Sequence, residues 1–229
     1  AGGGRLDAFE RAAVVVLSMV LGAAWCIIAS TLGVALFEYG RGGLSWDGVG
    51  LRVVQGERVL VDVSLLFCLL DPLLARTNNA PAKALLPLFL DRALSLGVWC
   101  GVLWLVPAAR VSLLCLLLLL ALWSARAHLT YTLQISREVV VVPAWLLRGG
   151  ATASLCLQPA IYAAELAVVG QAWTAAQADI QASHESPGVG WALTGALVVY
   201  PVVSALSFHW ALSAWAQTRP QGAGKRHAS

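Results

Sequence analysis

Residues 111–125 read VSLLCLLLLLALWSA, a run with no charged side chain and no face that would be polar in a helix. An amphipathic helix of a soluble protein carries a polar residue every three or four positions, and this run does not. Continued to Gln134, the segment reaches the roughly 20 residues that a helix needs to cross about 30 Å of hydrocarbon. The run therefore predicts a membrane-spanning helix whose polar residues, Arg126, His128 and Tyr131, gather at one end.

The composition of the whole chain agrees with a membrane environment. Of its 229 residues, 59% are hydrophobic and 12% are charged, and the mean hydropathy is +0.76. Soluble domains are about 45 to 50% apolar and about 25% charged. A β-barrel would alternate apolar and polar residues, which the run of leucines excludes. We therefore expect an all-α, polytopic transmembrane helix bundle that forms a single membrane domain over residues 1–229.

The charge of the chain argues against nucleic-acid binding, and its cysteines argue against disulfides and metal sites. The net charge is only +3 and the basic residues are scattered over loops, so nucleic-acid binding is not expected. The five cysteines lie in apolar stretches and form no CxxC pair. This pattern favours buried free thiols over disulfides or metal ligands.

The apolar blocks predict about six spans, or five if the second block does not cross. That second block is short and contains Asp62 and Asp71, and Pro72 predicts a bend or an end beside Asp71. In the third block, the alternative is a span that starts near Ala93, with residues 85–90 lying along the surface. The expected spans are 12–37, 59–75, 84–107, 111–134, 151–173 and 190–216, followed by a polar tail over 217–229.

Three connecting segments have their own patterns. Residues 51–63, LRVVQGERVLVDV, place two β-branched runs around Gln55 and Glu57, which predicts a short hairpin-like loop outside the membrane. Residues 139–147, VVVVPAWLL, are too short to cross and predict an interfacial or re-entrant piece anchored by Trp145 and Arg148. Residues 174–189 predict a loop.

Six spans put both termini on one side of the membrane. They also place more basic residues on that side than on the other. The positive-inside rule then places both termini in the cytoplasm, stroma or matrix. If the second block does not cross, much of this bias is lost. The terminal side carries Arg5, Arg11, Arg76, Lys83, Arg126, Arg137, Arg148, Arg219, Lys225 and Arg226, and the other side carries Arg41, Arg52, Arg58 and Arg110.

Ionisable residues inside spans are candidate functional groups because burying them is costly. Adjacent residues lie about 100° apart on a helix, so Asp91 and Arg92 need separate partners. A pairing of Glu165 with Arg92 or Arg126 would neutralise both groups, while snorkelling to the interface alone accounts for Arg126. The buried-charge candidates are Asp91, Arg92, Arg126 and Glu165, with Asp62 and Asp71 as further acids.

Motifs for catalysis are missing. The sequence contains no GxSxG, HExxH, Walker A or helix-opening GxGxxG pattern. His128 and His209 are weak candidates for axial haem ligands, provided that they lie at the same depth. No catalytic residue, cofactor or metal site is therefore predicted, and bound lipids are expected.

Three functions fit these patterns. The first is a non-catalytic subunit of a larger membrane complex, with lipids and other membrane subunits as partners. A respiratory-type complex of an organellar inner membrane, such as the mitochondrial one, fits the missing initiator methionine and the basic loops. The second is a small ion or solute transporter or channel that uses Asp91, Arg92 and Glu165, with prolines breaking helices nearby, although no convincing internal repeat is seen. The third is a membrane haem or enzyme subunit.

Overall fold

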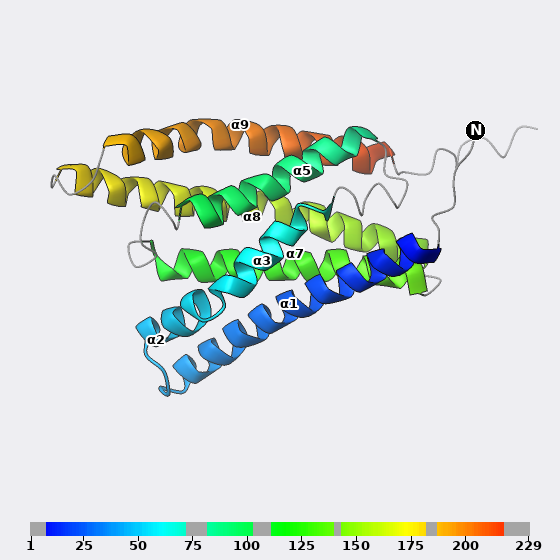
Figure 1. Cartoon of the computed structure of the whole chain (residues 1–229), viewed down its shortest axis with the longest axis horizontal. Coiled ribbons are helices and arrows are strands. Elements are labelled where there is room, and N and C mark those ends of the chain that lie inside the picture. The colour runs from blue at the N-terminus through cyan, green and yellow to red at the C-terminus, as the bar shows by residue number, and fades with distance from the viewer. Residues whose placement is uncertain (1–7, 72–81, 103–110, 140–142, 182–186, 218–229) are drawn as a thin grey trace, which may run out of the picture.

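The computed structural model describes residues 8–71, 82–102, 111–139, 143–181 and 187–217, and all regular elements within these ranges are helical (Figure 1). The predicted all-α bundle is therefore confirmed. Five of the described helices are long and apolar enough to cross a membrane. They cover Arg11–Gly40, Leu85–Val102, Leu113–Ser136, Trp145–Ala178 and Gly188–Ser213.

Four long helices contain the apolar blocks that the sequence indicates. They are α1 (Ala8–Gly40), α7 (Leu113–Val139), α8 (Ala144–Gln181) and α9 (Pro187–Gln217). Pro159 lies inside α8 and Pro201 inside α9. Neither proline ends its helix. In a membrane bundle, neighbouring helices and local backbone adjustments can satisfy the carbonyl group that a proline leaves without a hydrogen bond. The expected breaks at these prolines are wrong.

The second pass along the bundle is helical, so the hairpin predicted over residues 51–63 is wrong. Three short elements follow one another here: α2 (Trp46–Gly50), the π-helix η1 (Leu51–Gln55) and α3 (Arg58–Cys68). Burial explains the outcome: the valines of this stretch pack into the bundle, and packing overrides the β propensity of branched residues. The buried valines are Val49, Val53, Val54 and Val61, whose spacing includes the four-residue step of a helix.

Two further segments differ from the prediction. The helix α5 (Ala82–Leu96) begins well before Ala93 and continues past Pro87 into the π-helix η2 (Gly97–Val102), so the alternative start of the third span is wrong. Trp145 lies in the first turn of α8 and not in a separate interfacial piece, and α8 runs to Gln181 through much of the expected loop. Residues 72–81, 103–110, 140–142 and 182–186, which include parts of the expected second and third spans, lie outside the described ranges.

The helices form a closed ring. Helix α1 contacts α7, α7 contacts α8, and α8 contacts α9; α9 in turn contacts α5, α5 contacts α3, and α3 contacts α1. Neighbours in this ring bury side chains such as Trp25, Leu120 and Ile161 in one continuous core. The ring therefore has an interior to which every pass contributes.

The passes alternate in direction along the bundle axis. Figure 1 shows α1, α5 and α8 running one way and α3, α7 and α9 running the other, so that α1 begins and α9 ends at the same end of the bundle. We call the elements from α1 to η2 the first half and α7 to α9 the second half. Each long pass of the second half is antiparallel to the pass at the same place in the first half, and the pairs α1–α7 and α5–α9 join the halves.

Helices α1 and α7 are in van der Waals contact at Gly22. A Cβ atom at Gly22 would lie 3.6 Å from Cβ of Tyr131, whereas nothing lies within 4 Å of one at Gly33.

Large apolar side chains are exposed along α1 and α9, for example Phe37 and Val198, as expected for lipid-facing helices. All five cysteines are free, but Cys26 and Cys156 are exposed, contrary to the expectation that all are buried.

Candidate functional site

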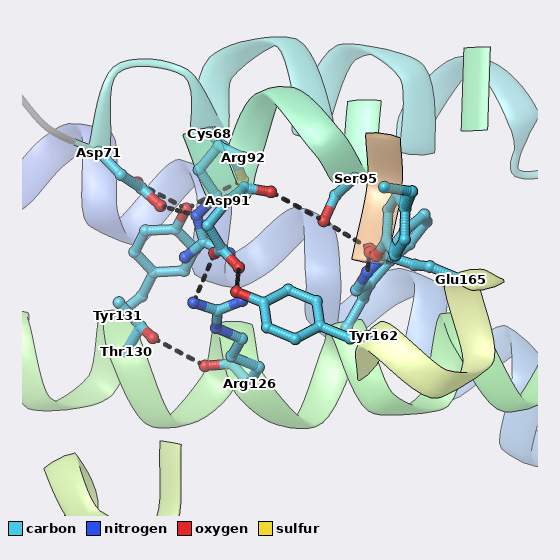
Figure 2. A network of polar contacts seen from close by, with 12 residues as sticks. Cys68, Asp71, Asp91, Arg92, Ser95, Arg126, Thr130, Tyr131, Tyr162 and Glu165 are labelled. Carbon is cyan, nitrogen blue, oxygen red and sulfur yellow. Dashed lines mark hydrogen bonds and ion pairs between the residues drawn. The ribbon is translucent and has the colours of Figure 1, made fainter. Parts of the chain in front are cut away.

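A network of charged and polar side chains fills the ring interior (Figure 2). Its charged members come from both halves and are shielded almost completely. Asp71 follows the end of α3, Asp91 and Arg92 lie on α5, Arg126 on α7 and Glu165 on α8. Their exposed fractions are 5% for Asp71, 1% for Asp91, 8% for Arg92, 4% for Arg126 and 0% for Glu165.

The first cluster of the network surrounds Asp71. Nε of Arg92 donates to Oδ2 of Asp71 at 2.7 Å, and the hydroxyl of Tyr131 donates to Oδ1 at 3.1 Å. Sγ of Cys68 lies 3.2 Å from the same hydroxyl. The cluster thus ties the end of α3 to α5 and α7, and both carboxylate oxygens of Asp71 are satisfied.

The second cluster surrounds Asp91. Nη2 of Arg126 lies 2.6 Å from Oδ2 of Asp91, and the hydroxyl of Tyr162 donates to Oδ1 at 2.7 Å. Nη1 of Arg92 is 3.9 Å from Oδ2, which links the two clusters. Asp91 and Arg92 therefore have separate partners. Arg126 is buried in this ion pair, so the interpretation of it as a snorkelling, loop-side cation is wrong.

The third cluster surrounds Glu165, and its partners are all neutral. Ser95 donates to Oε1 at 2.6 Å and Nε1 of Trp123 donates to the same oxygen at 2.9 Å. The hydroxyl of Tyr200 on α9 donates to Oε2. The suggested pairing of Glu165 with Arg92 or Arg126 is wrong, because both arginines are bound to aspartates.

A common pattern connects the three clusters. Each buried acid accepts a hydrogen bond from a tyrosine: Asp71 from Tyr131, Asp91 from Tyr162, and Glu165 from Tyr200. Each aspartate also has an arginine. Among the residues that the structure describes, Glu165 is the member of this set without a cation.

Ser95 connects the Glu165 cluster to the backbone of α5. Its hydroxyl lies 2.6 Å from Oε1 of Glu165 and 3.3 Å from the carbonyl oxygen of Asp91. A serine hydroxyl has a single proton, so it donates to one of these acceptors at a time. When Ser95 donates to the Asp91 carbonyl, its oxygen is free to accept a proton from Glu165.

Aromatic rings separate this network from a fourth acid, Asp62 on α3. Nε1 of Trp99 donates to Oδ1 of Asp62 at 2.7 Å. The ring of Trp99 packs edge-on against Trp123, with centroids 5.8 Å apart, and Trp123 packs in the same way against Trp25 at 6.4 Å. These tryptophans, from η2, α7 and α1, form an aromatic centre where the two halves meet.

A small cavity adjoins the Asp71 cluster and the aromatic centre. It has room for about one water molecule, so it leaves no space for a larger ligand in this conformation. Its polar lining comes from both halves of the chain. The lining residues are Trp25, Leu65, Cys68, Arg92, Ser95, Trp123, Ala127 and Tyr131.

The two candidate haem ligands do not converge. Nδ1 of His128 lies 3.7 Å from Sγ of Cys26 on α1. His209 is exposed on α9, which neighbours α8 and α5 in the ring and not α7. Within the described ranges, no group of three or more His, Cys, Asp or Glu side chains is placed to hold a metal ion.

Sequence reasoning found the charges but missed their neutral partners. Tyr162, Tyr200, Ser95 and Trp99 complete the network, and each looks ordinary in an apolar helix. One signal was available: Tyr162 and Glu165 are three residues apart, and Asp91 and Ser95 are four apart, which puts each pair on one helical face. The assignment of partners depends on helices far apart in the sequence.

The fold and this interior define the class of protein: an all-α, multi-pass membrane protein with a buried ionic network between two halves. Comparisons with protein-family models, with curated proteins and with solved structures find no match. The function must therefore be argued from the network itself.

Proposed function

We propose that the protein is a small secondary transporter in which Glu165 takes up and releases a proton. The observation that carries the proposal is the position of Glu165, 0% exposed between the two halves and held by neutral donors alone. An ionised carboxylate without a cation in the hydrocarbon region is costly, and such residues commonly belong to proton relays.

The surroundings of Glu165 accommodate both of its protonation states. When Glu165 is ionised, Ser95, Trp123 and Tyr200 all donate to it. When a proton binds to Oε1, this oxygen donates to Oγ of Ser95, whose own proton turns to the carbonyl oxygen of Asp91. The only rearrangement is a rotation of the Ser95 hydroxyl, so Glu165 and its three donors keep their hydrogen bonds in both states.

The arrangement of the helices also supports transport. Many secondary transporters consist of two halves of opposite orientation, with the ion or substrate site between them near the middle of the membrane. The α1–α3–α5 and α7–α8–α9 halves run in opposite directions, and the network lies where they meet. The Arg126–Asp91 ion pair and the Tyr131–Asp71 hydrogen bond then hold the halves together around the proton site, while the Arg92–Asp71 pair joins α5 to the end of α3 within the first half.

The test combines a spectroscopic and a transport measurement on reconstituted protein. Infrared titration should reveal a protonated carboxyl C=O band that is absent from the Glu165→Gln variant. Vesicles containing a pH-sensitive dye should acidify under an imposed gradient, and Glu165→Gln should reduce this flux to that of protein-free vesicles. Ser95→Ala should slow the flux without removing the band, because the acid remains while one of its proton acceptors is lost.

Glu38→Gln is the matched control, because Glu38 is a half-exposed acid paired with Arg52 away from the network. It should leave both signals unchanged. Equal flux in the wild type and Glu165→Gln, with no missing band, would refute the proposal. It would favour the other prediction made from the sequence, a non-catalytic subunit in which the network only fastens helices together.

The predicted sidedness becomes part of this proposal. With α1 beginning and α9 ending at one end of the bundle, we place that end on the cytoplasmic, stromal or matrix side, following the positive-inside rule. Arg11 belongs to that end and Arg41 to the opposite one. Proteolysis or labelling of residues near the ends of α1 and α9 in sealed vesicles tests this orientation.

A further inference from the structure

We infer that Asp62 and Trp99 form a second proton-binding site, the counterpart in the first half of Glu165 and Tyr200 in the second. This inference rests on the proposed function and extends it, because it assigns the transporter a pair of carboxylates related by the inverted arrangement of its halves.

The two sites occupy the same places in their halves. Asp62 lies on α3, the middle pass of the first half, and accepts a hydrogen bond at 2.7 Å from Trp99 of η2, which continues the third pass. Glu165 lies on α8, the middle pass of the second half, and accepts from Tyr200 on the third pass, α9. Each acid is thus bound by an aromatic donor from the next pass of its own half.

The local sequences agree with this correspondence. Residues 59–66 read VLVDVSLL and residues 162–169 read YAAELAVV, so each acid lies within a segment of mostly apolar residues. A tryptophan on the first pass of each half, Trp25 or Trp123, precedes the acid, and these two rings pack against each other at the junction of the halves. Few positions match between the two halves, and their opposite orientation becomes visible only once the helices are placed.

The two acids differ in accessibility. Glu165 is fully buried, whereas Asp62, close to the middle of α3, is only partly buried. If the halves exchange conformations, as inverted repeats do in transporters, Glu165 becomes accessible while Asp62 closes. The structure then represents one of two states, in which Asp62 is accessible for proton exchange and Glu165 is not.

The titratable neighbours of the two acids differ. Arg58 stands one turn before Asp62 on α3, and Cys100 on η2 lies close enough to interact with both side chains. Around Glu165 the titratable neighbours are Tyr200 and, more distantly, Asp91 and Tyr162. The Asp62 site thus has a thiol beside it, whereas the Glu165 site has phenol groups and a second carboxyl group.

A hydrophobic carbodiimide provides the first test on the reconstituted full chain, because it modifies protonated carboxyl groups in apolar surroundings. Peptide mass spectrometry should find adducts on both Asp62 and Glu165. Adducts on Glu165 alone, at every pH tested, would overturn the inference and leave the proposed function standing.

Proton flux provides the second test. Asp62→Asn should reduce the flux to background, as Glu165→Gln does, while Asp47→Asn, an exposed acid on α2, should leave it unchanged. Wild-type flux in Asp62→Asn together with lost flux in Glu165→Gln overturns the second site only, whereas unchanged flux in both variants overturns the proposed function as well.

If Asp62→Asn fails to fold, Trp99→Phe decides the matter, because it keeps the acid and the ring and removes the donated hydrogen bond. Altered flux in Trp99→Phe supports the second site. Unchanged flux in this variant overturns it.

Discussion

Replacing Arg126 by methionine should destabilise the protein far more than removing a cation from an exposed ion pair. The chain offers a matched comparison, because the pairs Arg126–Asp91 and Arg52–Glu38 have nearly equal distances of 2.6 and 2.5 Å. The side chains of the first pair are 5% and 1% exposed, and those of the second are 45% and 41% exposed. Burial is therefore the main variable between them.

The magnitude follows from what each variant leaves behind. Arg126→Met leaves Asp91 buried, with only Tyr162 and the more distant Arg92 as partners. Losing one member of a buried pair costs about 3–5 kcal/mol, and the remaining contacts place this variant near 3 kcal/mol. Arg52→Met leaves Glu38 in a half-exposed position, where a pair contributes about 0.2–1 kcal/mol.

The free energy of unfolding can be measured by titrating the protein in mixed micelles with a denaturing detergent and following helix content. The double variant Asp91→Asn with Arg126→Met leaves no unpaired charge, so its loss should be smaller than the sum of the single losses by about 1–3 kcal/mol. If Arg126→Met costs no more than Arg52→Met, or if the double variant is additive, the buried pair does not hold the halves as argued.

Three further predictions concern packing and accessibility. Gly22→Leu should destabilise the joint between α1 and α7 by about 1–3 kcal/mol in the same titration, whereas Gly33→Leu should be nearly neutral, because only the first site has Tyr131 beside it. Gly56→Ala should lower the midpoint of detergent unfolding, because its Cβ atom would clash with the backbone oxygen of Arg52. An unchanged midpoint would mean that the turn between η1 and α3 is not as tight as described. A lipid-soluble maleimide should modify the exposed Cys26 quickly and the buried Cys68 slowly, and equal rates by mass spectrometry would contradict the closed ring.

The apolar blocks were sufficient to predict the long helices of the bundle. Hydrocarbon supplies no hydrogen-bond partner, so a long uncharged segment has little choice but to form a helix that satisfies its own backbone. This constraint is local, and the run over residues 111–125 meets it without help from the rest of the chain. The same reasoning singled out Asp91, Arg92, Arg126 and Glu165, because charge in an apolar segment is visible in the sequence itself.

The prediction failed where two local patterns compete. Residues 51–63 have the β-branched runs of a hairpin and also the spacing of a helix that buries Val53 and Val61, and packing against α1 and α5 decides in favour of the helix. The partners of the buried charges were equally beyond local reasoning. Arg126 has an acid on α5 and Glu165 has hydroxyl and indole donors on three other helices.

The sequence by itself therefore determined that the chain is a helical membrane bundle and which of its residues carry charge into the interior, because both properties depend on the transfer of short segments out of water. Only the tertiary structure decided that the helices close into a ring of two oppositely oriented halves. It also decided that two acids receive arginines and Glu165 does not. Those outcomes depend on which helical faces meet, and contacts between distant segments are fixed by packing of the whole bundle and not by any one stretch of residues.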